Sequence, residues 1–173
     1  MSKQKTYNVL FLCTGNSARS IMGEVLTTFW SKGRFRGYSA GSHPRGKVNP
    51  MTLELLRNLQ LPTDGLRSKD WNEFTRPGAP PMDFVFTVCD HAAAEVCPVW
   101  PGQPMTAHWG IPDPAATEGD DVQRMLAFRE AFRTLENRIK TFIDLPITSL
   151  KRLQLKEKLD ELGQTPAHVD PCG

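Results

Sequence analysis

The sequence has no long apolar run and little net charge, and each absence excludes a class of protein. No segment approaches the roughly 20 apolar residues that a membrane-spanning helix needs. The 21 basic residues nearly balance the 19 acidic ones, for a net charge of +2. Nothing in the composition therefore points to binding of nucleic acid or of a membrane surface.

The sequence also has few cysteines, and its first residues contain no apolar run that resembles a signal peptide. Residues 1–7 are mostly polar, and the apolar run 9–12 is too short for a signal peptide, so we expect a cytoplasmic protein. In that compartment the four cysteines are more plausibly reactive thiols than cross-links. There is no close Cys-x2-Cys pair and the histidines are scattered, so a zinc site is not expected.

Strand and helix patterns alternate along the 173 residues. We expect strands at 9–12, 34–40, 83–88 and 105–108, and helices from about residue 20, from Pro50 to about 59 and over 120–143. The alternation predicts an α/β fold, a single domain with a four-stranded parallel sheet and helices on both faces. The apolar face of the last helix is expected to comprise Val122, Met125, Leu126, Phe128, Phe132, Leu135 and Ile139.

The chain is expected to divide at residue 145. Residues 1–145 form the predicted domain, and 146–173 form a C-terminal extension with a helix that ends at Gly163. The last ten residues are polar and are expected to be disordered.

The most informative segment is residues 9–20, where an apolar stretch leads directly into the pattern Cys-x5-Arg-Ser. A loop between the carboxyl end of a strand and the start of a helix turns several backbone N–H groups into one concavity, which suits an anion. The five residues between Cys13 and Arg19 are enough to surround a tetrahedral oxyanion. The expected anion-binding loop consists of Thr14, Gly15, Asn16, Ser17, Ala18 and Ser20.

Cys13 and Arg19 carry the expected chemistry of this loop. A nearby cation and a helix N-terminus favour the thiolate form of a thiol, which makes it a nucleophile. The guanidinium group of Arg19 contacts two oxygens of the anion, and Ser20 donates a hydrogen bond to the sulfur. Gly15 permits close backbone approach, and Asn16 tolerates a left-handed turn. The alternative is a buried cysteine at the end of a strand, with Arg19 exposed on the next helix.

Two further cysteines, Cys89 and Cys97, are eight positions apart. In a helix their Cα atoms would be about 12 Å apart, at about 1.5 Å per residue, whereas a disulfide needs about 4.4–6.8 Å. The segment must therefore loop or unwind if the two are to bond. The sequence leaves two interpretations open: a redox switch, or one structural cysteine beside an incidental one. Cys172, in the polar tail, is expected to be incidental.

Asp113 supplies a carboxylate in a loop that Pro114 holds extended. It suits a general acid for an oxygen that leaves an anion, although most Asp-Pro pairs are simply turns. Cys13, Cys89 and Asp113 all follow predicted strands, and ligands of parallel sheets bind beyond the carboxyl ends of the strands. His108 shows no partner in the sequence and is expected to be structural or at the surface.

Together these motifs resemble arsenate reductases built on the low-molecular-weight protein tyrosine phosphatase fold. The resemblance covers about residues 7–143 and implies a flavodoxin-like strand order. It rests on residues 13–20 (CTGNSARS), 38–41 (YSAG), Val88-Cys89 with Cys97-Pro98, and His108-Trp109-Gly110 leading to Asp113-Pro114-Ala115.

This chain departs from the phosphatases of the superfamily, which carry tyrosines after the Asp-Pro pair to flank an aromatic substrate. Here Ala115 and Ala116 follow, which favours a small bare oxyanion. Cys89 and Cys97 are one residue farther apart than the corresponding pair of the family usually is.

The resemblance implies reduction of arsenate to arsenite, for arsenic detoxification. The Cys13 thiolate attacks arsenic while Asp113 protonates the departing oxygen, Cys89 then attacks the Cys13 sulfur, and Cys97 attacks Cys89. The resulting disulfide passes to thioredoxin, or glutathione and glutaredoxin replace part of the relay. Phosphate or sulfate would bind as mimics of arsenate. We expect a monomer without a tightly bound cofactor.

Two other functions fit the same residues. A low-molecular-weight protein tyrosine phosphatase would use Cys13, Arg19 and Asp113, with Cys89 and Cys97 protective or structural. A non-catalytic oxyanion-binding or redox-sensing module would bind phosphate or arsenate without forming a product.

Some relatives bind a potassium ion near the loop. The matching positions here are Asn16, Glu24, Ser39, Ser68 and Asp70. The carboxylates of Glu24 and Asp70 suit a hard cation. The alternative is a hydrogen-bond network that supports the loop.

Overall fold

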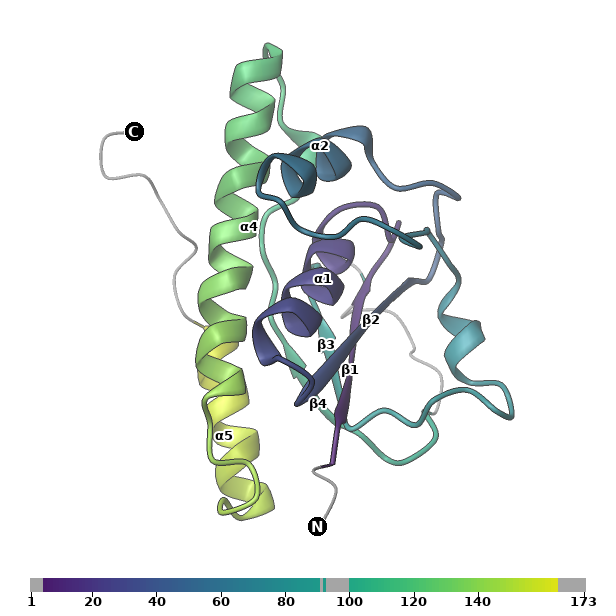
Figure 1. Cartoon of the computed structure of the whole chain (residues 1–173), viewed down its shortest axis with the longest axis vertical. Coiled ribbons are helices and arrows are strands. Elements are labelled where there is room, and N and C mark those ends of the chain that lie inside the picture. Colours follow the sequence, from purple (N-terminus) through teal and green to yellow (C-terminus); the bar gives the residue numbers. More distant parts are fainter. Residues whose placement is uncertain (1–4, 91, 93–99, 165–173) are drawn as a thin grey trace.

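Four parallel strands form the centre of the molecule, in the order β2-β1-β3-β4 (Figure 1). The computed structural model describes residues 5–90, 92 and 100–164. The strands are β1 (Tyr7–Cys13), β2 (Phe35–Gly41), β3 (Phe84–Thr87) and β4 (Met105–His108). The helices are α1 (Arg19–Ser31), α2 (Pro50–Asn58), α4 (Asp121–Ile143) and α5 (Arg152–Gly163), with short 3-10 helices η1 (Trp71–Phe74) and η2 (Pro114–Ala116). The predicted α/β class, parallel sheet and strand order are confirmed.

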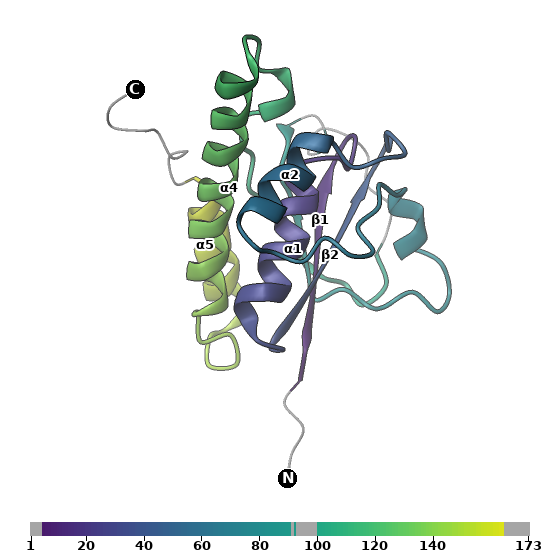
Figure 2. The ribbon, with the colours of Figure 1, turned by 45° about the horizontal axis from the view of Figure 1, so that its top comes forward.

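Successive side chains of a strand point to opposite faces of the sheet, so the strands contribute side chains to two apolar clusters. From β1, Val9, Phe11 and Cys13 face α1 and α4, whereas Leu10 and Leu12 face the other side. Figure 2 shows α1, α2, α4 and α5 on the same side of the sheet. Burial on both faces explains why β1 is a continuous apolar run rather than an alternating one.

The opposite face of the sheet has a smaller apolar cluster. Leu10, Leu12 and Val85 pack there with Phe74 of η1, together with Met82 and Trp100 in the described part of the connections. Part of the chain between residues 60 and 82 packs against this face. A β-bridge between Gly41 and Asp70 joins it to the carboxyl end of β2.

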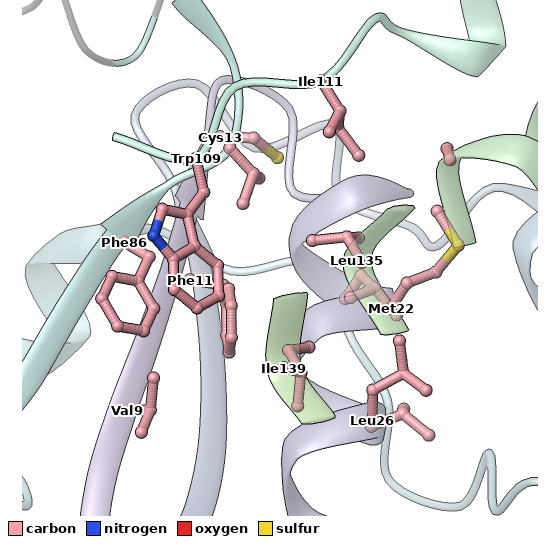
Figure 3. Close-up of a cluster of buried hydrophobic side chains, with 14 of the residues drawn as sticks. Val9, Phe11, Cys13, Met22, Leu26, Phe86, Trp109, Ile111, Leu135 and Ile139 are labelled. Carbon is pink, nitrogen blue, oxygen red and sulfur yellow. The ribbon is translucent and has the colours of Figure 1, made fainter. Parts of the chain in front are cut away.

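Trp109 lies at the centre of the larger cluster. It is fully buried, and its ring stacks on Phe86 with centroids 4.0 Å apart and an interplanar angle of 10° (Figure 3). Its indole N–H donates to the backbone carbonyl of Leu159 on α5 at 2.9 Å. This buried donor is therefore satisfied only because α5 docks on the sheet.

The helix α5 is packed into the same core as the rest of the chain. Leu155 and Leu159 are 6% and 0% exposed. The division of the chain at residue 145 stays a prediction, and the tail that is expected to be disordered lies outside the described residues. None of the described helices is long and apolar enough to cross a membrane.

The helix ends follow the capping residues of the sequence. Asn49 accepts a hydrogen bond from Met51 N ahead of Pro50, and Asp120 caps α4 in a capping box with Gln123. One expectation for α4 was wrong, because Val122 and Leu126 are 78% and 48% exposed. Figure 1 shows that the first turns of α4 extend past α1, so this end of its apolar face has little to cover it.

We predict that Leu159→Ala lowers the free energy of unfolding by about 2–5 kcal/mol, because it leaves a cavity beside Trp109. The matched control is Leu153→Ala on the same helix, since Leu153 is 71% exposed, and a change within about 0.5 kcal/mol is expected there. Urea unfolding of the two variants measures the difference. Equal stabilities would show that α5 contributes nothing to the core.

Candidate active site

The carboxyl ends of the strands surround a cavity of about 510 Å³. Its floor is the loop between β1 and α1, and its walls are the segments that follow β2, β3 and β4. The residues that line it are Cys13, Thr14, Gly15, Ser17, Ala18, Arg19, His43, Arg45, Cys89, Asp90, Ile111, Pro112, Asp113 and Ala115. The residues that were predicted from separate motifs are therefore brought to one place.

The thiol of Cys13 lies at the base of this cavity and is hydrogen-bonded beneath it. The backbone N–H of Asn16 donates to Sγ at 3.2 Å, and Ser20 Oγ is 2.9 Å from Sγ. Ser20 Oγ also accepts from Asn16 Nδ2 at 2.8 Å, so its own proton is left to donate to the sulfur. Asn16 and Ser20 are fully buried and contact the sulfur from below rather than lining the cavity.

The loop keeps its shape through bonds on its outer side. The carbonyls of Thr14, Gly15 and Ser17 accept from His43, Arg45 and Asn49 respectively, at 2.9–3.0 Å. These three hydrogen bonds hold the carbonyls on the outer side of the loop. Asn16 has the left-handed conformation that was predicted, with φ 46°. Gly41 of β2 is required because a Cβ there would lie 2.4 Å from the Thr14 carbonyl oxygen.

The helix α1 begins without a side-chain cap. Its N-cap residue is Ala18, which offers no acceptor to the first-turn N–H groups. Those groups and the helix dipole are therefore available to an anion held in the loop.

Arg19 is held at the mouth of the cavity rather than exposed on the helix. Its side chain is 14% exposed, and Nη1 donates to the Ile111 carbonyl at 3.0 Å. Nη2 lies 3.7 Å from Asp113 Oδ2, whereas Oδ1 of Asp113 accepts from Ala115 N at 3.0 Å. The loop that carries the predicted acid is thus joined to the predicted anion-binding cation. This arrangement argues against the alternative of an exposed Arg19.

A second thiol opens on the same cavity. Cys89, just after β3, is 4% exposed and is a free thiol like Cys13. Its Sγ accepts from Ala92 N at 3.3 Å and lies 3.6 Å from the hydroxyl of Thr14, the residue next to Cys13. Cys97 and Cys172 lie outside the described residues.

Two positioning residues were not predicted from the sequence. Arg138 of α4 is 4% exposed and donates to the carbonyls of Trp109 and Gly110 at 3.0 and 3.3 Å. Burial lowers the pKa of Arg138 from its usual range, but a guanidinium remains charged in proteins. No pattern marked it, because a charge on a helix is normally solvated. It holds the start of the loop that leads to Asp113.

His108 also has partners that the sequence did not reveal. Its Nδ1 lies 2.8 Å from Thr87 Oγ1, and its Nε2 lies 2.7 Å from Asp90 Oδ1. A Cβ at Gly110 would meet His108 Nε2 at 2.6 Å, which explains the glycine of the His-Trp-Gly motif. This bridge joins the segments that follow β3 and β4.

The positions matched to a potassium site separate into two groups. Asn16, Glu24 and Ser39 converge on the ammonium group of Lys69. Ser68 and Asp70 do not join them: Ser68 Oγ donates to the Gly15 carbonyl, and Asp70 caps η1. In the described part of the chain, no three His, Cys, Asp or Glu residues form a group suited to a metal ion.

The site agrees with a family match over most of the chain. The family model described as low molecular weight phosphotyrosine protein phosphatase matches residues 8–158. The chain belongs to this family. The match extends past residue 143, where the sequence resemblance was expected to end, into the buried helix α5.

The most similar relatives include proteins named arsenate reductase. One from Halalkalibacterium halodurans is 35% identical over 144 residues, which cover 83% of this chain and 98% of that protein. One from Bacillus cereus is 36% identical over 127 residues, which cover 72% and 88%.

Solved structures show that the fold is shared by reductases and phosphatases. An arsenate reductase from Archaeoglobus fulgidus has a TM-score of 0.64 and 26% identity, covering 79% of this chain and 99% of its own. A low molecular weight protein tyrosine phosphatase from T. tengcongensis has a TM-score of 0.62 and 21% identity, covering 80% and 98%. The activity must therefore be argued from the site.

We predict that Ser20→Ala slows alkylation of Cys13 by iodoacetamide roughly tenfold, because a hydrogen bond to a charged group contributes about 1.5–3 kcal/mol. The rate is measured by mapping the labelled peptide. Thr27→Val is the control, since it removes from α1 a buried hydroxyl that has no hydrogen-bond partner among the described residues. If both variants are alkylated at the rate of the unsubstituted protein, Ser20 does not support the thiolate.

Proposed function

We propose that this protein reduces arsenate to arsenite with Cys13 as the nucleophile. The observation that carries the proposal is the second free thiol: Cys89 is buried in the wall of the cavity whose base holds Cys13. A phosphatase needs only the first of these thiols, whereas a two-electron reduction needs a second sulfur to take over the bond. The names of the relatives support the same reaction.

The first step forms a covalent adduct. Arsenate enters the loop, where Arg19 and the start of α1 balance its charge. The Cys13 thiolate attacks arsenic and forms a sulfur–arsenic bond, and one oxygen leaves as water with a proton from Asp113. The position of Asp113 supports this role, because Asp113 lines the cavity above the loop and one of its oxygens is held by Ala115 N.

The second step transfers the electrons. The Cys89 thiolate attacks the Cys13 sulfur, and the electron pair of the sulfur–arsenic bond moves to arsenic, so arsenic(V) becomes arsenic(III) and arsenite leaves. A Cys13–Cys89 disulfide remains. Cys97 then attacks Cys89, releasing Cys13 as a thiolate and forming a Cys89–Cys97 disulfide. Thioredoxin reduces that disulfide, or glutathione and glutaredoxin replace part of the relay.

The lining of the cavity supports a small substrate. Ala115, the residue that follows the Asp-Pro pair, lines the cavity and carries only a methyl side chain. Among the described lining residues there is no Phe, Tyr or Trp to stack against an aryl phosphate. The cytoplasmic location and the monomeric state stay predictions of the sequence.

We predict that the reduced protein, mixed with arsenate and no external thiol, forms one disulfide for each arsenite released. Thiol titration and mass mapping should place it between Cys89 and Cys97. Cys89→Ser should abolish release of arsenite, whereas Cys172→Ser should leave it unchanged. Loss of thiols only after addition of glutathione would indicate the glutaredoxin variant, and arsenite release by Cys13→Ser would contradict the mechanism.

The phosphatase alternative makes a different prediction. Under our proposal, hydrolysis of an aryl phosphate is much slower than reduction of arsenate, because the described lining of the cavity has no Phe, Tyr or Trp to stack on the aromatic ring. Asp113→Asn should slow both reactions by about 10²-fold, since both need a proton on the leaving oxygen. A fast aryl phosphatase that releases no arsenite would establish the alternative, and tight arsenate binding without any product would establish the binding module.

A further inference from the structure

Lys69 is a buried lysine below the anion-binding loop. Its side chain is 7% exposed. The ammonium group donates to the Arg67 carbonyl at 2.9 Å and to Ser39 Oγ at 3.2 Å. Oxygens of Asn16 and Glu24 lie 3.4 and 3.5 Å from it. A carboxylate, a hydroxyl, an amide and a backbone carbonyl thus surround one positive charge.

Four oxygen atoms arranged in this way form the kind of environment that binds a hard monovalent cation. Three of them, from Asn16, Glu24 and Ser39, are the residues that the family resemblance matched to potassium. The two other matched residues make hydrogen bonds elsewhere. Ser68 Oγ donates to the Gly15 carbonyl and accepts from Gly46 N, and Asp70 Oδ1 accepts from Asn72 N.

The residues therefore do not fit a potassium ion, because the ammonium group of Lys69 already occupies the space between these oxygens. Burial lowers the pKa of Lys69, and the carboxylate of Glu24 opposes that shift. The ammonium group loses hydration on burial. Its ion pair with Glu24, whose side chain is 20% exposed, and its contacts with the other three oxygens compensate for that loss.

We infer that Lys69 is a built-in cation: its ammonium group takes the place of a potassium ion beneath the loop and makes the protein independent of potassium. In the proposed reaction Lys69 is a positioning residue, since it acts on Cys13 through other groups. The inference rests on the proposed function only in assigning Cys13 as the nucleophile.

A continuous set of hydrogen bonds connects Lys69 to the thiol. Asn16 Oδ1 accepts from the backbone N–H of Lys69 at 2.9 Å and faces its ammonium group. This fixes which end of the Asn16 amide is oxygen, so its NH₂ group must donate to Ser20. Ser20 in turn donates its proton to Cys13 Sγ. The charge of Lys69 polarises each bond toward stabilising a thiolate.

The test compares two substitutions in the full-length protein. Lys69→Met keeps the length of the side chain without its charge, and Lys69→Ala removes both, leaving room for an ion. Lys158→Met is the matched control, because it removes one positive charge from the exposed face of α5. Each protein is studied in KCl, NaCl and choline chloride at equal ionic strength, by thermal unfolding and by the rate of Cys13 alkylation.

We expect the unsubstituted protein and Lys158→Met to unfold at the same temperature in KCl as in choline chloride. Lys69→Met should be alkylated about tenfold more slowly in all three salts. Lys69→Ala should be equally slow in choline chloride, and KCl should restore both its alkylation rate and its unfolding temperature with saturation.

Three results would overturn the inference. The first is saturable stabilisation of the unsubstituted protein by KCl over choline chloride. The second is alkylation of Lys69→Met at the normal rate. The third is failure of KCl to restore Lys69→Ala, whether that variant is folded or unfolded. Because alkylation needs no arsenate, these outcomes are independent of whether the protein reduces arsenate, which the thiol count decides.

Discussion

The hydrogen bonds of Asn16 are the interactions on which the rest of the site depends. The side-chain oxygen of Asn16 accepts from the backbone N–H of Lys69, its side-chain NH₂ group donates to Ser20, and its backbone N–H donates to Cys13. All of this requires the left-handed backbone at residue 16, which turns the loop around the sulfur. One residue thus couples the shape of the loop, the charge of Lys69 below it and the sulfur of Cys13.

The sheet supplies the frame that makes this arrangement rigid. Gly41 lets β2 approach the loop, and the two apolar clusters hold β1 between them. On the other side of the cavity, the stacked pair of Phe86 and Trp109 and the buried Arg138 fix the chain that leads to Asp113. Groups from distant parts of the sequence therefore meet with little freedom left, which lowers the entropic cost of reaction.

Much of the fold and of the site could be predicted from local patterns. The apolar run before Cys13, the Asn-Pro start of α2 and the alternation of strands and helices are each determined by a few neighbouring residues. The rim position of Cys13, Cys89 and Asp113 followed from the rule for parallel sheets. These features need no knowledge of which distant side chains touch.

What could not be predicted depends on such distant contacts. A lysine between Ser68 and Asp70 has no local sign that it is buried, because Glu24, Ser39 and Asn16 come from other elements. Arg138 was hidden for the same reason. Val122 and Leu126 show the converse error: the helical period marks a face, but only the length of the neighbouring helix decides how much of it is covered.

The uncapped start of α1 has a consequence for selectivity. Its first N–H groups have no side-chain acceptor, so an anion held in the loop gives them a partner and stabilises the folded protein. Phosphate is a tetrahedral oxyanion of similar charge to arsenate and can accept hydrogen bonds from the same groups. Under the proposed function, the two are therefore sorted after binding rather than by it. A phosphate can occupy the loop and depart unchanged, whereas arsenic(V) accepts an electron pair from sulfur. The ease with which arsenic is reduced therefore separates the two anions, and the binding loop does not.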